Sequence, residues 1–144
     1  MNGPGRIEAE CLVPGTARAN AVVLTRPLSL WGGFDLETGT VLDIHHPQAG
    51  ELLAGQVLVM PGGRGSSSSS SILLEAARLG VHPAAIVLSE PDPVLVMGAL
   101  LAGDLYYVEI PIVRVRAQRL GRFSNGQPVS VFAAAERCFV DCNR

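Results

Sequence analysis

The chain has 144 residues, of which 48% are hydrophobic, enough for one packed core without disulfides or a structural metal. Its formal net charge is −2, and its 11 basic residues are all arginines. Because nucleic-acid binding requires basic side chains clustered on one face, we expect no nucleic-acid partner.

A membrane span is also not expected, because no apolar run reaches the ~18 residues that one requires. The mean hydropathy of +0.32 is nevertheless high, and surplus apolar surface favours a protein partner. Residues 1–10 contain no apolar segment typical of a signal peptide, and the three cysteines are then expected to be reduced thiols. We therefore expect a cytoplasmic protein.

Residues 6–60 contain the patterns of short strands, turns and one shaped loop. The loop spans residues 27–35, where Gly32 and Gly33 allow backbone angles that other residues resist. Residues 56–60 are apolar and lie before Pro61, which predicts a buried strand. Other strands are expected at residues 6–13, 19–24 and 40–44.

Two helices are expected in the second half of the chain, at residues 72–79, ended by Gly80, and at residues 94–102. Arginines recur within residues 114–122, a pattern that favours a solvated strand face, although contacts at the rim of another subunit explain it equally well. Further strands are expected at residues 84–88, 110–115 and 129–132.

These elements predict an α/β fold of mostly short strands with two or more helices. Strands and helices do not alternate regularly, so a doubly wound parallel sheet is not expected. We assign residues 1–144 to a single domain, in which residues 116–144 form a C-terminal extension.

The strongest local motif is Gly63-Arg64-Gly65-Ser66, between the buried strand and the first helix. A glycine-rich turn that opens a helix directs backbone N–H groups at one point and stabilises an anion or an oxyanion there. The spacing fits neither a Walker A loop nor a dinucleotide-binding fingerprint. A plain strand-to-helix turn with Ser66 as the helix N-cap explains the motif as well as an active site does.

Ser66 begins a run of six serines and is a candidate general base. Lowering the pKa of a hydroxyl by on the order of six units requires about 8 kcal/mol, whereas a helix terminus supplies at most ~2 kcal/mol. Arg64, desolvated backbone donors and a bound substrate or metal would have to supply the rest. A serine base is therefore competent only in an assembled site.

Other candidate residues have ordinary structural explanations as well. Neighbouring histidines on a strand face opposite ways, which argues against a metal site at His45 and His46. Cys138 and Cys142 have a C-x-x-x-C spacing without further clustering, which favours buried thiols over zinc ligands. Trp31 is expected to anchor the core or an interface. The remaining candidate is the carboxylate pair Glu90 and Asp92.

Five motifs, in this order, resemble the small subunit of aconitase X, over about residues 5–115. They are residues 27–35 (PLSLWGGFD), 37–39 (ETG), 46–47 (HP), 63–66 (GRGS) and 90–93 (EPDP).

The resemblance implies a swivelling β/β/α domain that closes over an active site held mainly by a larger subunit. In that family the larger subunit carries an iron–sulfur cluster on its own cysteines, so this chain is expected to bind none. Ser66 occupies the position of the family's proton acceptor, and we expect Arg64, Gly65 and Ser67 to bind the substrate beside it.

Two reactions occur in the family: dehydration of cis-3-hydroxy-L-proline and dehydration of mevalonate 5-phosphate. In both, the serine would remove a proton next to a carboxylate while the cluster, as a Lewis acid, helps a β-hydroxyl leave. Arg64 and the serine-rich continuation favour the hydroxyproline reaction, with a small hydroxy acid as substrate. The alternative from another class is a non-catalytic module that binds an anion.

Overall fold

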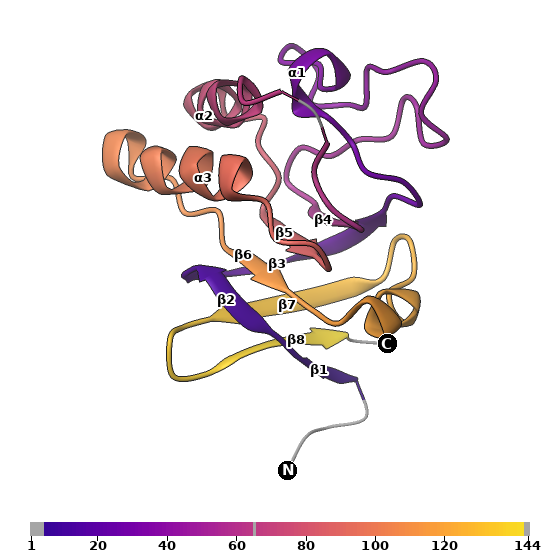
Figure 1. Cartoon of the computed structure of the whole chain (residues 1–144), viewed down its shortest axis with the longest axis vertical. Coiled ribbons are helices and arrows are strands. Elements are labelled where there is room, and N and C mark those ends of the chain that lie inside the picture. Colours follow the sequence, from indigo (N-terminus) through magenta and orange to yellow (C-terminus); the bar gives the residue numbers. More distant parts are fainter. Residues whose placement is uncertain (1–4, 65, 143–144) are drawn as a thin grey trace.

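The computed structural model describes residues 5–64 and 66–142, which form one sheet covered on one face by helices (Figure 1). The sheet has eight strands in the order β1-β8-β7-β3-β4-β5-β6-β2. Its strands are β1 Arg6–Glu8, β2 Glu10–Val13, β3 Gly15–Val23, β4 Val57–Met60, β5 Ala85–Leu88, β6 Ile112–Arg114, β7 Pro128–Ala133 and β8 Cys138–Cys142. The helices are α1 Leu30–Gly33, α2 Ser69–Leu79, α3 Pro93–Tyr106 and the 3₁₀ helix η1 Ala117–Arg122.

The sheet closes on itself. Strands β3, β4, β5 and β6 are parallel neighbours, while β7 and β8 continue the sheet in antiparallel fashion beyond β3. The two outermost strands, β1 and β2, are consecutive in the chain, and β1 pairs with β8 while β2 pairs with β6. One short N-terminal segment therefore pairs with both β8 and β6, the strands at the two ends of the rest of the sheet.

The central strands are buried on both faces, which explains their unbroken apolar sequences. Along β4, Leu58 and Met60 point to the core beneath the helices, and Val57 and Val59 point into the closed part of the sheet. All four side chains are at most 1% exposed. The strand predicted at residues 56–60 is thus confirmed, and its end is held rigidly from two sides.

Most of the remaining predicted elements are found, with shifted limits. The first helix begins at Ser69, before the predicted start, and the second spans Pro93–Tyr106. Residues 6–13 form two strands, because the chain changes partners at Ala9. The strand β8 and the 3₁₀ helix η1 had no counterpart in the prediction. Within the described residues, no helix is long and apolar enough to cross a membrane.

Two predictions of strand are wrong. Residues 40–44 make only isolated bridges, Phe34 to Val41 and Thr40 to Leu52, because the segment folds back on its own loop. Of the arginines after β6, Arg116 immediately precedes η1, and Arg119 and Arg122 lie on it, so they do not form a strand face.

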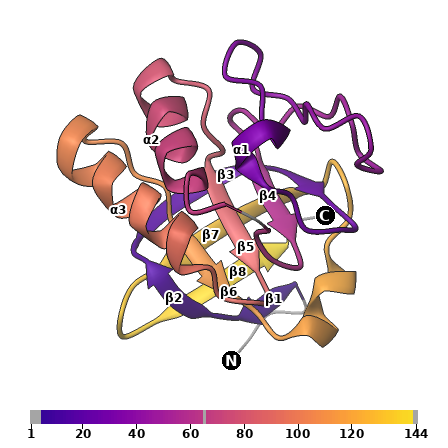
Figure 2. The same cartoon turned by 45° about the horizontal axis from the view of Figure 1, so that its top comes forward.

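Helices α2 and α3 lie side by side on the sheet (Figure 2). Gly98 is the point of close approach, because a Cβ atom there would lie 2.8 Å from the carbonyl oxygen of Ser70 and 3.2 Å from the Cβ of Leu73. The glycine is therefore required by packing, although it lowers the helix propensity of α3.

A matched pair of substitutions tests this packing. Gly98→Ala should lower the free energy of unfolding by about 1–3 kcal/mol through overpacking. Gly103→Ala in the same helix should raise it by up to ~1 kcal/mol, because the nearest atom to its added Cβ is 3.8 Å away. Urea denaturation measures both values. Equal stability of the two variants would contradict the proposed close approach.

Candidate functional site

The candidate site lies where β4 and β5 end. These strands are parallel neighbours, so the loops that follow them meet at the same edge of the sheet. The two loops enclose a cavity of about 210 Å³. Its lining residues are Gly63, Arg64, Ser66, Ser69, Glu90, Pro91, Asp92, Pro93 and Val94.

Ser66 is half-buried at this cavity, and its hydroxyl oxygen accepts a hydrogen bond from the backbone N–H of Ser68, at 3.0 Å. Its carbonyl oxygen accepts another from the N–H of Ser69, also at 3.0 Å. Because α2 begins at Ser69 and is preceded by Ser68, Ser66 lies one turn before the helix and is not its N-cap residue. A backbone donor aimed at Oγ favours the ionised form of the hydroxyl.

Arg64 is exposed at the rim of the same cavity. Within the described residues, its guanidinium forms no ion pair and no side-chain hydrogen bond. It is thus available to an anionic ligand, for which a guanidinium supplies paired donors. Of the other residues expected to bind substrate, Gly65 lies outside the described residues, and Ser67 is exposed and does not line the cavity.

The serine run is not uniform in the structure. Ser69 is only 4% exposed, and its Oγ accepts a hydrogen bond from the backbone N–H of Trp31 at 3.2 Å. This bond ties α1 to the start of α2. In contrast, the Trp31 side chain is 58% exposed and does not anchor the core. Of the two roles expected for Trp31, contact with another protein is the one that this exposure allows.

Ser89 connects the two loops, a role that the sequence did not indicate. Its backbone N–H and its hydroxyl both donate to the carbonyl oxygen of Pro61, at 3.2 and 2.9 Å. Its own carbonyl accepts a hydrogen bond from Arg114 Nε at 3.1 Å. Pro61, the first residue of the loop that contains Gly63 and Arg64, is therefore fixed to the residue that follows β5.

Asp92 has a structural role that weakens the hypothesis of a catalytic carboxylate pair. Its Oδ1 accepts hydrogen bonds from the N–H groups of Val94 and Leu95, at 2.9 and 3.4 Å, and so caps α3. The carboxylate also packs against Gly63, where an added Cβ would lie 2.9 Å from its Cγ. Glu90 is exposed beside the cavity.

A second cavity, of about 440 Å³, adjoins the first and shares Arg64 with it. Arg26, Asp43 and the exposed His45 also line it. His46 is buried and has a structural role: its Nδ1 accepts from the N–H of Gln48 at 3.0 Å, and its Nε2 lies 3.1 Å from the Arg26 carbonyl oxygen.

The described part of the chain does not offer ligands for an iron–sulfur cluster or a metal ion. It contains no group of three His, Cys, Asp or Glu side chains that could hold a metal. Burial raises the pKa of each of the thiols Cys11, Cys138 and Cys142, that of Cys138 to about 11. Because a cysteine ligates metal as the thiolate, raised thiol pKa values disfavour such a role.

Substitutions of Asp92 test its capping role. Asp92→Ala should lower the free energy of unfolding by about 1 kcal/mol, because two N–H groups of α3 lose their acceptor. Asp92→Asn keeps an acceptor oxygen and should cost only a few tenths of a kcal/mol. Thermal or urea denaturation measures the difference; an Asn variant as unstable as the Ala variant would contradict capping.

Comparisons with known proteins agree on one family. The family model described as aconitase X swivel domain matches residues 6–140. The chain is 46% identical to cis-3-hydroxy-L-proline dehydratase of Pseudomonas aeruginosa over 101 residues, which is 70% of this chain but only 17% of that protein. It is 45% identical to the phosphomevalonate dehydratase small subunit of Methanopyrus kandleri over 102 residues, 71% of this chain and 75% of that protein.

The fold agrees with a solved structure as well. The crystal structure of Thermococcus kodakaraensis aconitase X in its holo-form aligns with a TM-score of 0.85 and 29% sequence identity, covering 99% of this chain and all of the matched chain. The aligned region includes β7 and β8, which lie beyond the five sequence motifs.

Proposed function

Because the chain belongs to the aconitase X swivel-domain family, we propose that it is the small subunit of a two-subunit dehydratase in which Ser66 accepts the substrate proton. The observation that carries the proposal is the pairing of Ser66 Oγ, 3.0 Å from a backbone N–H donor, with the exposed Arg64 at one cavity. The alternative, a non-catalytic module that binds an anion, accounts for the exposed guanidinium of Arg64 but assigns no role to the Ser66 hydroxyl.

In the proposed reaction, the substrate loses a proton from the carbon next to its carboxylate and a hydroxyl from the next carbon, which leaves a double bond and water. Ser66, ionised, takes up the proton at Oγ and must release it before the next turnover; this proton and the departing hydroxide together make up the water. Arg64 holds the substrate carboxylate through charge-assisted hydrogen bonds. Ser68, through its N–H, stabilises the ionised oxygen before the proton arrives.

A larger subunit is required on energetic grounds. Ionising a serine hydroxyl near neutral pH costs about 8 kcal/mol, and a single backbone hydrogen bond to a charged oxygen contributes about 1.5–3 kcal/mol. Exclusion of water and further donors must come from the surface that closes over the cavity. We place the iron–sulfur cluster on that larger subunit, where it would supply Lewis-acid chemistry.

We propose cis-3-hydroxy-L-proline as the substrate. At neutral pH this amino acid carries a carboxylate and a ring ammonium group. The cavity at Ser66 is lined by Arg64 and by the exposed Glu90, as well as by Asp92, which caps α3. Such a pairing of opposite charges complements a zwitterion.

Mevalonate 5-phosphate is the second candidate, and the adjoining cavity favours it. That cavity is lined by Arg26, His45 and Arg64, with Asp43 as the one acidic residue. The Asp43 carboxylate already accepts a hydrogen bond from the His45 N–H at 2.9 Å. With Arg64 at the substrate carboxylate near Ser66, the Arg26 guanidinium is suited to a phosphate on the far end of the substrate.

The proton acceptor is tested by Ser66→Ala in the complex co-expressed with the neighbouring reading frame. Turnover should fall by at least about 100-fold, the usual scale for a general base, while the subunits still co-purify. Ser71→Ala is the matched control, because Ser71 belongs to the same run but is exposed and away from both cavities. Activity that survives Ser66→Ala would place the base elsewhere.

The substrate is tested by assaying the same complex on both compounds. We expect turnover of cis-3-hydroxy-L-proline, with a KM that Arg26→Gln leaves nearly unchanged. If mevalonate 5-phosphate is the substrate instead, Arg26→Gln should raise its KM by about 10-fold or more through loss of a charged hydrogen bond. Turnover of mevalonate 5-phosphate alone would overturn the proposed substrate.

A further inference from the structure

Three arginines follow β6 at a spacing of three residues. Arg116 immediately precedes η1, and Arg119 and Arg122 lie in its last turn. A 3₁₀ helix has 3.0 residues per turn, so side chains three residues apart lie on the same face. The spacing therefore gathers three guanidinium groups along one side of η1.

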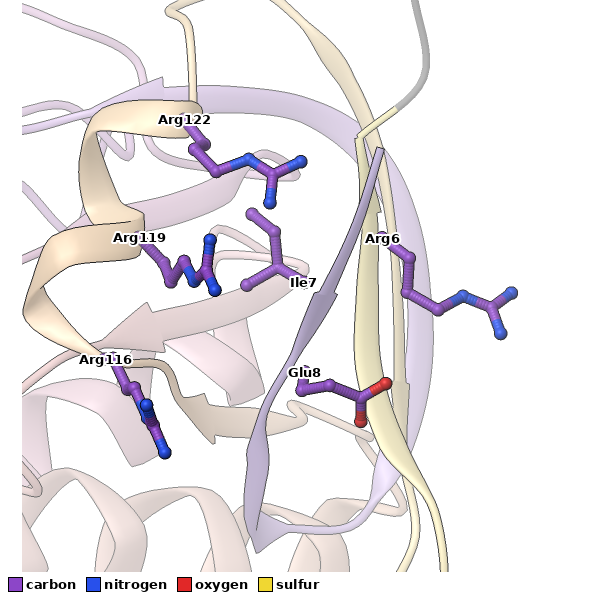
Figure 3. Close-up of a pocket in the computed structure, with 6 residues that line it drawn as sticks. All are labelled: Arg6, Ile7, Glu8, Arg116, Arg119 and Arg122. Carbon is purple, nitrogen blue, oxygen red and sulfur yellow. The ribbon is translucent and has the colours of Figure 1, made fainter. Parts of the chain in front are cut away.

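These side chains line a cavity of about 320 Å³ between η1 and β1. Figure 3 shows Arg119 and Arg122 extending from η1 towards β1, where the Ile7 side chain points back at them. The side chains of Arg6 and Glu8, the neighbours of Ile7 on β1, extend from the opposite side of the strand in Figure 3, but both residues also line the cavity. Among the residues that line the cavity, Glu8 is the one acidic residue, beside four arginines.

Arg6 has its own partners on that other side. Its Nε lies 3.0 Å from Asp141 Oδ1, and its guanidinium lies 3.8 Å from the ring centre of Phe139. The charge of Asp141 is therefore engaged by Arg6. Among the described residues, Arg116 and Arg119 form no ion pair and no side-chain hydrogen bond.

Arg116 and Arg119 carry like charges into one cavity whose lining has a single carboxylate, that of Glu8, so an added anion would relieve their repulsion. Such a cluster is also unexpected in a chain with a net charge of −2. Arginine is the side chain best suited to phosphate, since its planar fork donates two parallel hydrogen bonds to neighbouring oxygens. The cavity is within the size range of small-ligand sites.

From this geometry we propose that the cavity between η1 and β1 is a binding site for a phosphate group, either free or as the monoester of a small metabolite. Arg116 and Arg119 supply donors to the phosphate oxygens, and Ile7 forms the apolar floor. The site is separate from the one proposed for dehydration, because the two cavities at Ser66 share no residue with it. Its occupation would fix η1 against β1, the strand that closes one edge of the sheet.

The test is a calorimetric titration of the full chain with inorganic phosphate and with methyl phosphate at low ionic strength, where arginine–phosphate attraction is least screened. We expect saturable binding that Arg119→Gln weakens by about ten-fold or more. Arg18→Gln is the matched control, because Arg18 is exposed on β3 and lines none of these cavities; it should leave binding unchanged. If methyl phosphate binds more tightly than inorganic phosphate, the result supports a phosphate monoester as the ligand. Equal affinity for the two probes supports free phosphate.

Three results would overturn the proposal. The first is no binding of either probe. The second is binding that survives Arg119→Gln but is lost with Arg64→Gln, which would assign it to the cavities near Ser66. The third is loss of co-purification of the larger subunit with Arg119→Gln and no phosphate binding, which would make the arginines a docking surface for an acidic segment. If Arg119→Gln proves unfolded by circular dichroism, Arg116→Gln serves in its place.

Discussion

The contact between Gly63 and Asp92 sets the shape of the candidate site. Asp92 must lie close to the glycine loop while it caps α3, and only a residue without a side chain leaves room for its carboxylate. Ser89 fixes the same two loops to each other through the Pro61 carbonyl. Because β4 and β5 are parallel and buried on both faces, the loops start from a rigid edge, and Ser66 is positioned by the core itself.

This construction is consistent with the proposal that the cavity at Ser66 is one part of a site shared with a larger subunit. At this cavity the described residues supply the Ser66 hydroxyl, the exposed Arg64 guanidinium and a backbone donor, and no group of three metal-binding side chains is found among them. Each available interaction is small beside the free energy needed to ionise a serine. The proposed ionisation of Ser66 therefore requires a second surface that excludes water from the cavity. The exposed Trp31 and Ile44, on the segments beside the cavities, are suited to contact such a surface.

Much of the fold could be predicted from the sequence because local patterns determine it: the apolar run of β4, the glycine loop and the helical stripe of α2 each have a local signature. The split of residues 6–13 at Ala9 could not be predicted, since it depends on partners more than 100 residues away, such as Val140 for Ile7 and Val113 for Cys11. Six identical serines gave no sign that Ser69 alone is buried. The three-residue spacing of Arg116 and Arg119 does not match the two-residue period of a strand, and the structure places Arg119 on a 3₁₀ helix with Arg116 just before it.

The central claim is that this chain completes a dehydratase site that neither subunit forms alone. Its most direct test is to purify this chain and the proposed larger subunit separately, and to measure turnover of both candidate substrates by each protein and by their mixture. The account predicts turnover only in the mixture. Full activity of the larger protein without this chain, or no turnover of either substrate by the iron-loaded mixture, would contradict it.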